Sequence, residues 1–98
     1  MDVRDRVPTQ LRDLVAGAAV VDVNVGGAMD GTTTVATVLD ALAAQHPALE
    51  RRIRDEQGHV RPHVNIFVGA DNLRDLDGPA TPITAGEELT IIPAVSGG

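Results

Sequence analysis

The C-terminal part of the chain reads Ile83-Thr-Ala-Gly-Glu-Glu-Leu-Thr-Ile-Ile-Pro-Ala-Val-Ser-Gly-Gly98. Within it, Leu89 and Ile91 share one side of an alternating pattern, which predicts a short final strand after a turn at residues 85–87. Pro93 closes this strand, because proline cannot donate a ladder hydrogen bond. Residues 94–98 do not have the composition of a packed segment. The sequence therefore predicts a strand that leads directly into a tail.

Three earlier segments also alternate like strands. They are residues 3–7, which stop at Pro8, residues 19–25 and residues 64–68. The stretch between the first two is short and turn-like, so we expect these strands to form a hairpin. A tight turn at residues 71–72 predicts a further short strand around residues 73–76.

After Thr34 the spacing of apolar residues changes from every second residue to a period of about 3.6, which predicts an amphipathic helix. Its apolar stripe consists of Val35, Val38, Leu39, Leu42 and Ala43. The Thr34 hydroxyl can accept a hydrogen bond from a free first-turn N–H, so Thr34 is the expected N-cap. His46-Pro47 ends the helix, since the residue before proline resists the helical region. A short helical turn is expected at residues 49–54.

The predicted element order is β-β-α-β-β-β with one main helix, which defines an α+β class. We expect a mixed four- or five-stranded sheet wrapped around that helix. The strand parities place one set of side chains against the helix: Val21, Val23, Val25, Val64, Ile66, Val68, Leu89 and Ile91. They place a second set on the outer face: Arg4, Arg6, Val20, Asp22, Asn65, Phe67, Thr90 and Ile92.

Composition narrows the functional classes. The chain has 98 residues, the size of one domain, and a formal net charge of -6 with a single aromatic residue. These features disfavour a nucleic-acid-binding protein, which needs basic charge and stacking rings. There is no cysteine for disulfides or thiol catalysis. Neither a membrane span nor a secretory signal is recognisable, so a cytoplasmic location is expected.

The element order and its ending resemble the ubiquitin-like sulfur carriers, the MoaD/ThiS family of β-grasp proteins. The resemblance extends over nearly the whole chain and is carried by residues 3–11, 34–39, 46–47, 64–69 and 83–98. Within the family it is closest to the CysO-type carriers of cysteine synthesis. Glu87 stands where the family usually has aspartate after the last turn glycine, which is a conservative difference.

The resemblance implies that the chain is a protein co-substrate rather than an enzyme. In the family, an E1-like enzyme of the MoeB/ThiF type uses ATP to adenylate the terminal carboxylate, and a sulfur donor converts it to a thiocarboxylate. Gly98 would be the modified residue, and no residue of the chain would be catalytic. We expect residues 1–92 to form the β-grasp domain, with no bound cofactor and as a monomer.

The expected tail comprises residues 93–98. Pro93, Ala94, Val95, Ser96 and Gly97 would thread the partner's active site, and the glycine pair suits a narrow channel because glycine has no Cβ. Residues 94–98 reach roughly 17 Å when extended, enough to cross such a channel. A glycine-rich end without a role is the alternative interpretation.

The acceptor of the sulfur stays open at this stage. A pyridoxal-phosphate-dependent cysteine synthase is favoured as the partner, followed by molybdopterin, thiamin or secondary-metabolite thiolation. Two further functions are compatible with the sequence. One is a ubiquitin-like modifier joined to lysines through the same glycine, and the other is a β-grasp binding module with an idle tail.

A partner-binding patch is predicted on the outer face of the sheet. Phe67 and Ile92 would lie side by side near the tail, flanked by Arg4 and Arg6. An apolar spot with a polar rim is typical of a docking site. The alternative is that Phe67 belongs to a minor core under the loop at residues 73–85.

No metal site is expected. His59 and His63 are four residues apart, but Pro62 lies between them and prevents the helical geometry that would bring them together.

Overall fold

The computed structural model describes residues 2–26, 31–84 and 86–93. Its main sheet has five strands in the order β2-β1-β7-β4-β5, and it is mixed because β1 pairs in parallel with β7 while its other pairings are antiparallel. The strands are β1 (Asp2–Arg6), β2 (Val20–Asn24), β4 (Val64–Val68), β5 (Asp71–Asn72) and β7 (Glu88–Pro93). The expected mixed sheet is therefore confirmed.

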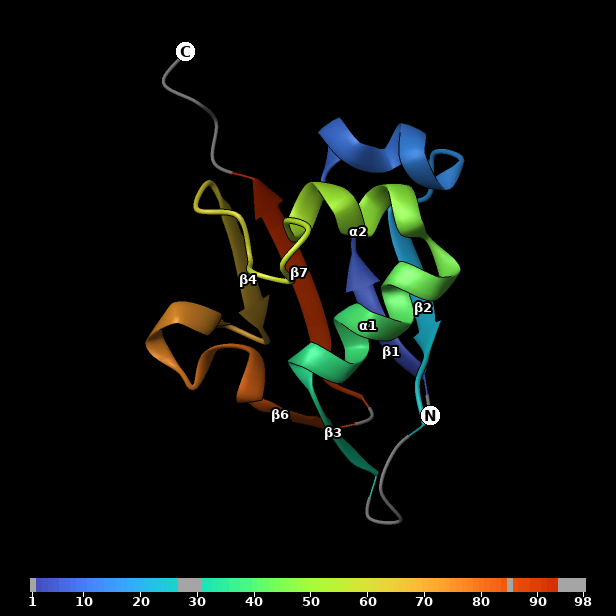
Figure 1. The fold of residues 1–98 in the computed structure, drawn as a ribbon. Coiled ribbons are helices and arrows are strands. Elements are labelled where there is room, and N and C mark those ends of the chain that lie inside the picture. The colour runs from blue at the N-terminus through green and yellow to red at the C-terminus, as the bar shows by residue number, and fades with distance from the viewer. Residues whose placement is uncertain (1, 27–30, 85, 94–98) are drawn as a thin grey trace.

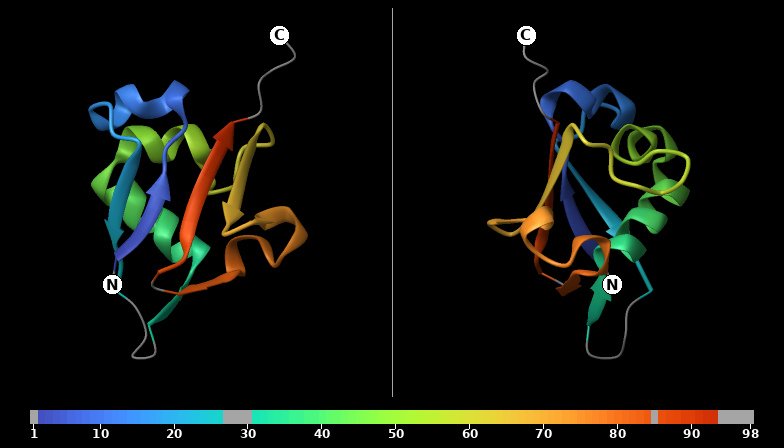
Figure 2. Two further views of the ribbon diagram at one scale, coloured as in Figure 1. Left: turned by 180° about the vertical axis from the view of Figure 1, so that it is seen from behind. Right: turned by 60° about the vertical axis from the view of Figure 1, so that its left-hand side comes forward.

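Two helices cover one face of this sheet and leave the other face uncovered (Figures 1 and 2). Helix α1 (Val35–Gln45) begins where predicted, because Thr34 Oγ1 accepts a hydrogen bond from the Thr37 N–H at 3.3 Å. Helix α2 (Pro47–Ile53) starts directly after His46, with Pro47 in its first turn. Proline is favoured there, because a first-turn N–H has no partner within the helix.

The core lies between the helices and the sheet. The stripe of α1 is buried through Val35, Val38, Leu39 and Leu42, and α2 adds Leu49 and Ile53. All eight strand residues that were predicted to face the helix are buried. The apolar period of the helix and the alternation in the strands therefore predicted these core residues correctly.

The chain between the main elements departs from the prediction. Residues 73–75 form a 3₁₀ helix, η2 (Leu73–Asp75), so the strand predicted around residues 73–76 is wrong. The hairpin turn is at Gly69-Ala70, with Gly69 at a φ of 60°, and Asp71 and Asn72 are paired with β4. The Asn72 side chain then accepts a hydrogen bond from the Arg74 N–H and begins η2, which draws the chain away from the sheet.

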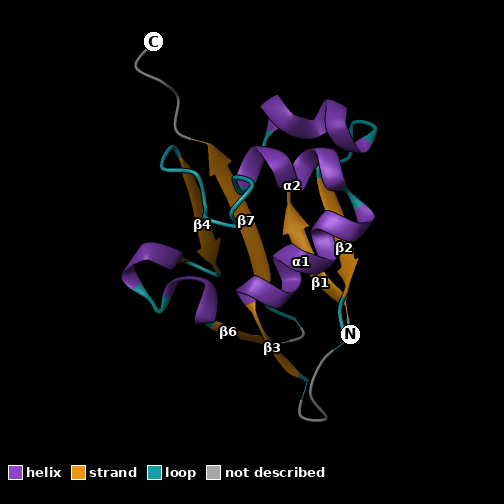
Figure 3. Cartoon of the chain, viewed as in Figure 1, coloured by secondary structure: helices purple, strands orange, loops and turns teal. Residues whose placement is uncertain are grey.

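Several short elements were not predicted. A second, two-stranded sheet pairs β3 (Thr32–Thr34) with β6 (Pro82–Thr84). Strands this short have no alternation that a sequence pattern could reveal. Two more 3₁₀ helices are η1 (Thr9–Val15), which connects β1 to β2, and η3 (Gly78–Ala80). Figure 3 shows these helical turns in purple around the sheet.

Strand β7 includes Pro93, so the sheet reaches one residue into the predicted tail. Asp2, the first residue of β1, and Pro93, the last residue of β7, lie at opposite ends of the sheet (Figure 1), because β1 and β7 run in parallel. No helix within the described ranges combines the length and the apolar character that a membrane span requires.

Candidate functional site

The uncovered face of the sheet carries the predicted outer set of side chains. None of these eight residues is buried, and Arg4, Arg6, Asp22 and Ile92 are exposed. The left view of Figure 2 shows this face in front of the helices. The sheet therefore offers a broad surface that no element of the described chain covers.

The tail begins at one end of this face. Pro93, the last residue of β7, lies opposite Val64, the first residue of β4. Ala94, Val95, Ser96, Gly97 and the predicted reacting residue Gly98 lie outside the described residues. The position of Pro93, the residue before them, is fixed because β7 pairs with both β1 and β4 in the middle of the sheet.

Two apolar side chains of the outer face lie close to Pro93. Ile92 is 45% exposed and pairs across the sheet with Asn65, while Phe67 is half-buried and pairs with Thr90. Phe67 and Ile92 are thus diagonal neighbours on adjacent strands, a spacing that an aromatic ring can bridge. We refer to these two residues as the outer patch.

Phe67 does not belong to the core of the described chain. It is absent both from the buried cluster and from the partly buried residues packed against that cluster. Leu73, which follows the cross-strand partner of Phe67, is by contrast buried in the core. Phe67 is therefore not part of the main core, and its role in a partner-binding patch stays a prediction.

Both predicted arginines are members of ion pairs on the outer face, but only Arg6 lies beside Thr90, the cross-strand partner of Phe67, whereas Arg4 lies beside Glu88 at the end remote from Pro93. The Arg6 guanidinium contacts the Glu88 carboxylate, and Arg4 Nε lies 3.7 Å from Asp22 Oδ1. All four side chains belong to neighbouring strands of the same face. Exposed pairs of this kind contribute little stability, so a partner can rearrange them at low cost.

Acidic groups gather at the end of the face that is remote from Pro93. A hollow of about 360 Å³ is lined there by Asp2, Arg4, Asp22, Gly86, Glu87 and Glu88. The outer face is therefore apolar near the tail and acidic at the other end. The sequence parities had placed only part of this set, because Glu87 comes from the turn before β7.

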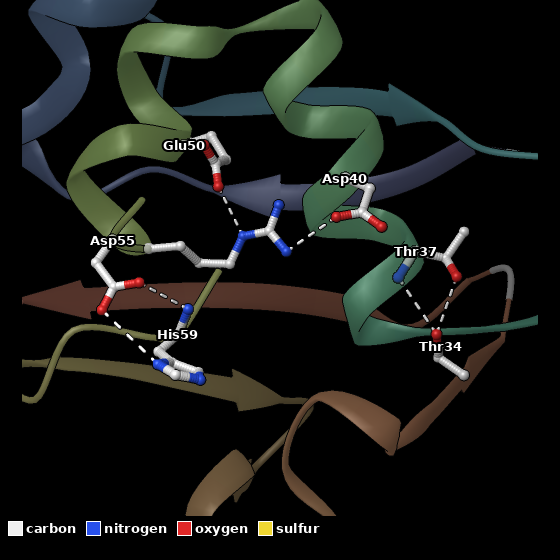
Figure 4. A network of polar contacts seen from close by, with 7 residues as sticks. Thr34, Thr37, Asp40, Glu50, Asp55 and His59 are labelled. Carbon is white, nitrogen blue, oxygen red and sulfur yellow. Dashed lines mark hydrogen bonds and ion pairs between the residues drawn. The ribbon is translucent and has the colours of Figure 1, made fainter. Parts of the chain in front are cut away.

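The histidines do not converge on a metal site. Among the described residues, no group of three or more His, Asp and Glu side chains is arranged to hold an ion. His59 instead contacts Asp55, whose carboxylate accepts hydrogen bonds from the N–H groups of His59 and Gln57 (Figure 4). The His59 N–H is the main cause that holds the pKa of Asp55 below its ordinary value.

One titratable residue was missed by the sequence reading. Asp5 faces the core between Val3 and Val7, is 0% exposed, and neither carboxylate oxygen has a hydrogen-bond partner. Burial, together with the negative charge of Asp22, raises its pKa from 3.8 to about 8. The parity of residues 3–7 could have revealed this position, since Asp5 shares the face of the two buried valines.

Comparison with known proteins identifies the family of the chain. The ThiS family pattern matches residues 6–98, and the chain belongs to that family. This also confirms the resemblance inferred from the sequence.

Two curated relatives differ in their described roles. The small archaeal modifier protein 1 of Haloferax volcanii is 42% identical over 84 residues, which cover 86% of this chain and 87% of the relative. The sulfur carrier protein CysO of Mycobacterium tuberculosis is 33% identical over 100 residues, covering 100% of both proteins. The chain is thus similar to a protein modifier and to a sulfur carrier.

Solved structures of relatives share the fold. A chain from the crystal structure of the Amycolatopsis orientalis BexX/CysO complex matches with a TM-score of 0.79 at 29% identity, over 98% of this chain and 99% of that one. SAMP1 from Haloferax volcanii matches with a TM-score of 0.78 at 32% identity over 100% of both chains. The fold is the β-grasp, ubiquitin-like fold.

Proposed function

We propose that this protein is a sulfur carrier whose Gly98 carboxylate is activated by an E1-like enzyme and converted to a thiocarboxylate. The observation that carries the proposal is the placement of Pro93. It ends the central strand β7 beside the exposed Ile92, so a partner that contacts the outer patch stands next to the start of the tail. The family match through residue 98 supports the same role.

The proposed activation of the Gly98 carboxylate needs no catalytic side chain from the folded domain. A carboxylate is a poor electrophile, so one of its oxygens first attacks the α-phosphorus of ATP and releases pyrophosphate. Sulfide then attacks the carbonyl carbon, and the bond to the AMP oxygen breaks. The partner enzyme supplies ATP binding and catalysis, and the carrier is a co-substrate that binds no cofactor of its own.

A cysteine synthase of the pyridoxal-phosphate class is the favoured acceptor, because the similarity to CysO extends over the full length of both chains. Molybdopterin, thiamin or secondary-metabolite thiolation are the other acceptor pathways. In each of them the carrier would act in the cytoplasm as a monomer.

The second candidate function is a ubiquitin-like modifier joined to lysines of other proteins. The similarity to small archaeal modifier protein 1 favours it specifically. The two functions share the adenylate and differ in the nucleophile that attacks it, which is sulfide for the carrier and a lysine amine for the modifier. Intact masses separate them, because one product exchanges oxygen for sulfur and the other forms an isopeptide adduct.

The test is incubation with an E1-like enzyme, ATP and sulfide, followed by intact mass measurement. Gly98→Ala, or one residue added after Gly98, should abolish activation while the thermal unfolding curve stays unchanged. A thiocarboxylate on either variant would contradict the role of Gly98. If neither a sulfur-bearing product nor an adduct forms with the natural sequence, the idle-tail binding module is the better description.

The outer patch is tested by a matched pair of truncations. Ile92→Ala should weaken binding to the activating enzyme about tenfold or more, as expected for a central apolar anchor. Arg52→Ala is the control, because Arg52 is exposed on α2 and belongs neither to the outer face nor to the segments at residues 58–62 and 73–79. Phe67→Ala should behave like Ile92→Ala, and a loss of thermal stability with unchanged binding would refute the patch.

A further inference from the structure

A groove on the other side of β4 is not used by the outer patch. It has a volume of about 440 Å³, and its apolar walls include Val60, Pro62, Val64, Ile66, Leu73 and Pro79. It is lined by residues of the segment before β4 and of the segment at residues 73–79, and Figure 1 shows both segments on the β4 side of the sheet. Cavities of this size with mainly apolar walls are typical of binding sites.

One permanent charge stands at the wall of this groove. Arg74 Nη2 donates hydrogen bonds to the carbonyl oxygens of Pro62 and Val64, both at 2.9 Å. These contacts fix the guanidinium at the groove without neutralising it, because carbonyl oxygens carry no net charge. Among the described residues, no carboxylate forms an ion pair with Arg74.

The lack of an acidic partner is informative in a chain with a formal net charge of -6. Arg54 shows the contrast, since its guanidinium contacts both Glu50 and Asp40. The hydrogen bonds that hold Arg74 in place all come from Nη2. The other N–H groups of its guanidinium are therefore available to bind a carboxylate. The groove therefore combines apolar walls with an unneutralised cation.

The groove is also continuous with the start of the tail. Val64, one of its lining residues, is the cross-strand partner of Pro93. Val64 and Ile66 face this side of the sheet, whereas Asn65 and Phe67 face the outer side. A partner that takes up the tail thus passes the groove as well as the outer patch, on opposite sides of the same strand.

We propose that this groove, between β4 and the segments at residues 58–62 and 73–79, is a second docking surface for the enzyme that receives the tail. It takes an apolar side chain flanked by a carboxylate, with the apolar part against Val60 and Leu73 and the carboxylate on Arg74. The proposal rests on the proposed function, in which the tail enters a partner enzyme. It adds that the partner is recognised by an apolar side chain next to a carboxylate.

The test uses two blocked dipeptides as probes, N-acetyl-leucyl-glutamate amide and N-acetyl-leucyl-glutamine amide. They are titrated into the ¹⁵N-labelled full chain at low ionic strength. The glutamate peptide should bind in the millimolar range, as small ligands do, and shift the amide signals of Val60, Val64, Leu73 and Arg74. The glutamine peptide should bind several-fold more weakly. Equal binding of the two peptides, or shifts confined to the outer face, would overturn the proposal.

Variants separate the charge from the fold. Arg74→Gln should remove the preference for glutamate, and Arg74→Lys should restore part of it, because lysine keeps the charge without the planar donors. Arg4→Gln, at the acidic end of the outer face, should bind like the natural sequence. A full glutamate preference in Arg74→Gln with an unchanged spectrum would contradict the assignment.

The peptide titration does not depend on sulfur transfer, so the two proposals fail independently. If the natural chain forms no thiocarboxylate but binds the glutamate peptide in the groove, only the proposed function fails. If thiocarboxylate forms and passes to the acceptor equally well with Arg74→Gln, the groove has no docking role.

Discussion

Two largely buried ionisable side chains in this small domain differ in whether they have partners. At the C-terminal end of α2, the Arg54 side chain is only 11% exposed and contacts Glu50 Oε2 of α2 at 2.6 Å and Asp40 Oδ1 of α1 at 3.0 Å (Figure 4). In the sheet, Asp5 is fully buried and has no hydrogen-bond partner. A buried charge with partners stays ionised, whereas a buried carboxyl without partners is stabilised as the neutral acid.

The difference has a consequence for stability. The Arg54–Asp40 pair connects the end of α2 to α1, and the Arg54–Glu50 pair lies within α2 and its C-cap, so loss of Arg54 would leave Glu50 nearly buried without its partner. Asp5 lies between Val21 of β2 and Leu89 of β7, in the same sheet that positions the tail. Its ionisation at alkaline pH would place an unpaired charge among apolar side chains.

Asp5→Val should have the largest effect, and it should depend on pH. The folded pKa of Asp5 is about 8 and the unperturbed value is 3.8, so the folded state holds the proton more tightly. The natural protein is therefore most stable relative to the variant below about pH 4. It loses roughly 1.4 kcal/mol for each pH unit between the two values. Urea unfolding at pH 5 and pH 8 measures this difference, and the variant should gain more stability at pH 8.

Asp5→Asn provides the control for this comparison, because it keeps the size and polarity of the group but cannot ionise. It should show the flat pH dependence of Asp5→Val with a smaller gain in stability, since an unpaired polar group stays buried. The same pH slope in both variants and the natural protein would show that Asp5 is not the titrating group.

Arg54→Met should have the next largest effect, in the opposite direction. Methionine keeps much of the side-chain volume but leaves the Glu50 carboxylate without its partner, which we expect to cost about 2–3 kcal/mol of unfolding free energy. The unfolding free energy of Arg54→Lys should fall between those of the natural protein and Arg54→Met, because one ammonium cannot reproduce both guanidinium contacts. Unchanged stability of Arg54→Met in urea would mean that the helix junction does not depend on the pairs.

Asp40→Asn should have the smallest effect and sharpen the comparison within the Arg54 site itself. The Asp40 side chain is 73% exposed, against 13% for Glu50. Solvent screens the exposed pair, so its loss should cost less than about 0.5 kcal/mol. Glu50→Gln is the matched change at the buried partner and should cost more. An equal loss in the two variants would refute the link between burial and the strength of the pair.

The main elements and the two faces of the sheet could be predicted from the sequence because their patterns are local. Alternation in residues 64–68 and 89–92 places Phe67 and Ile92 on the outer face, and the helical period after Thr34 identifies the stripe of α1. The family resemblance added the proposed roles of the tail and Gly98. The patterns failed between Leu73 and Thr84, where Asn72 begins a 3₁₀ helix and a three-residue strand pairs with a distant one.

By itself, the sequence determined the α+β class, the order of the main elements and the core parity, since period and hydrophobicity act over neighbouring residues, and the family resemblance added the β-grasp fold. Only the tertiary structure decided which charges have partners. The contact of Arg54 with Asp40, those of Arg74 and the unpaired state of Asp5 join or isolate residues from different elements, whereas the Arg54–Glu50 pair has the local i,i+4 spacing. Spacing along the chain contains no information on these distances, because packing of the helices on the sheet sets them.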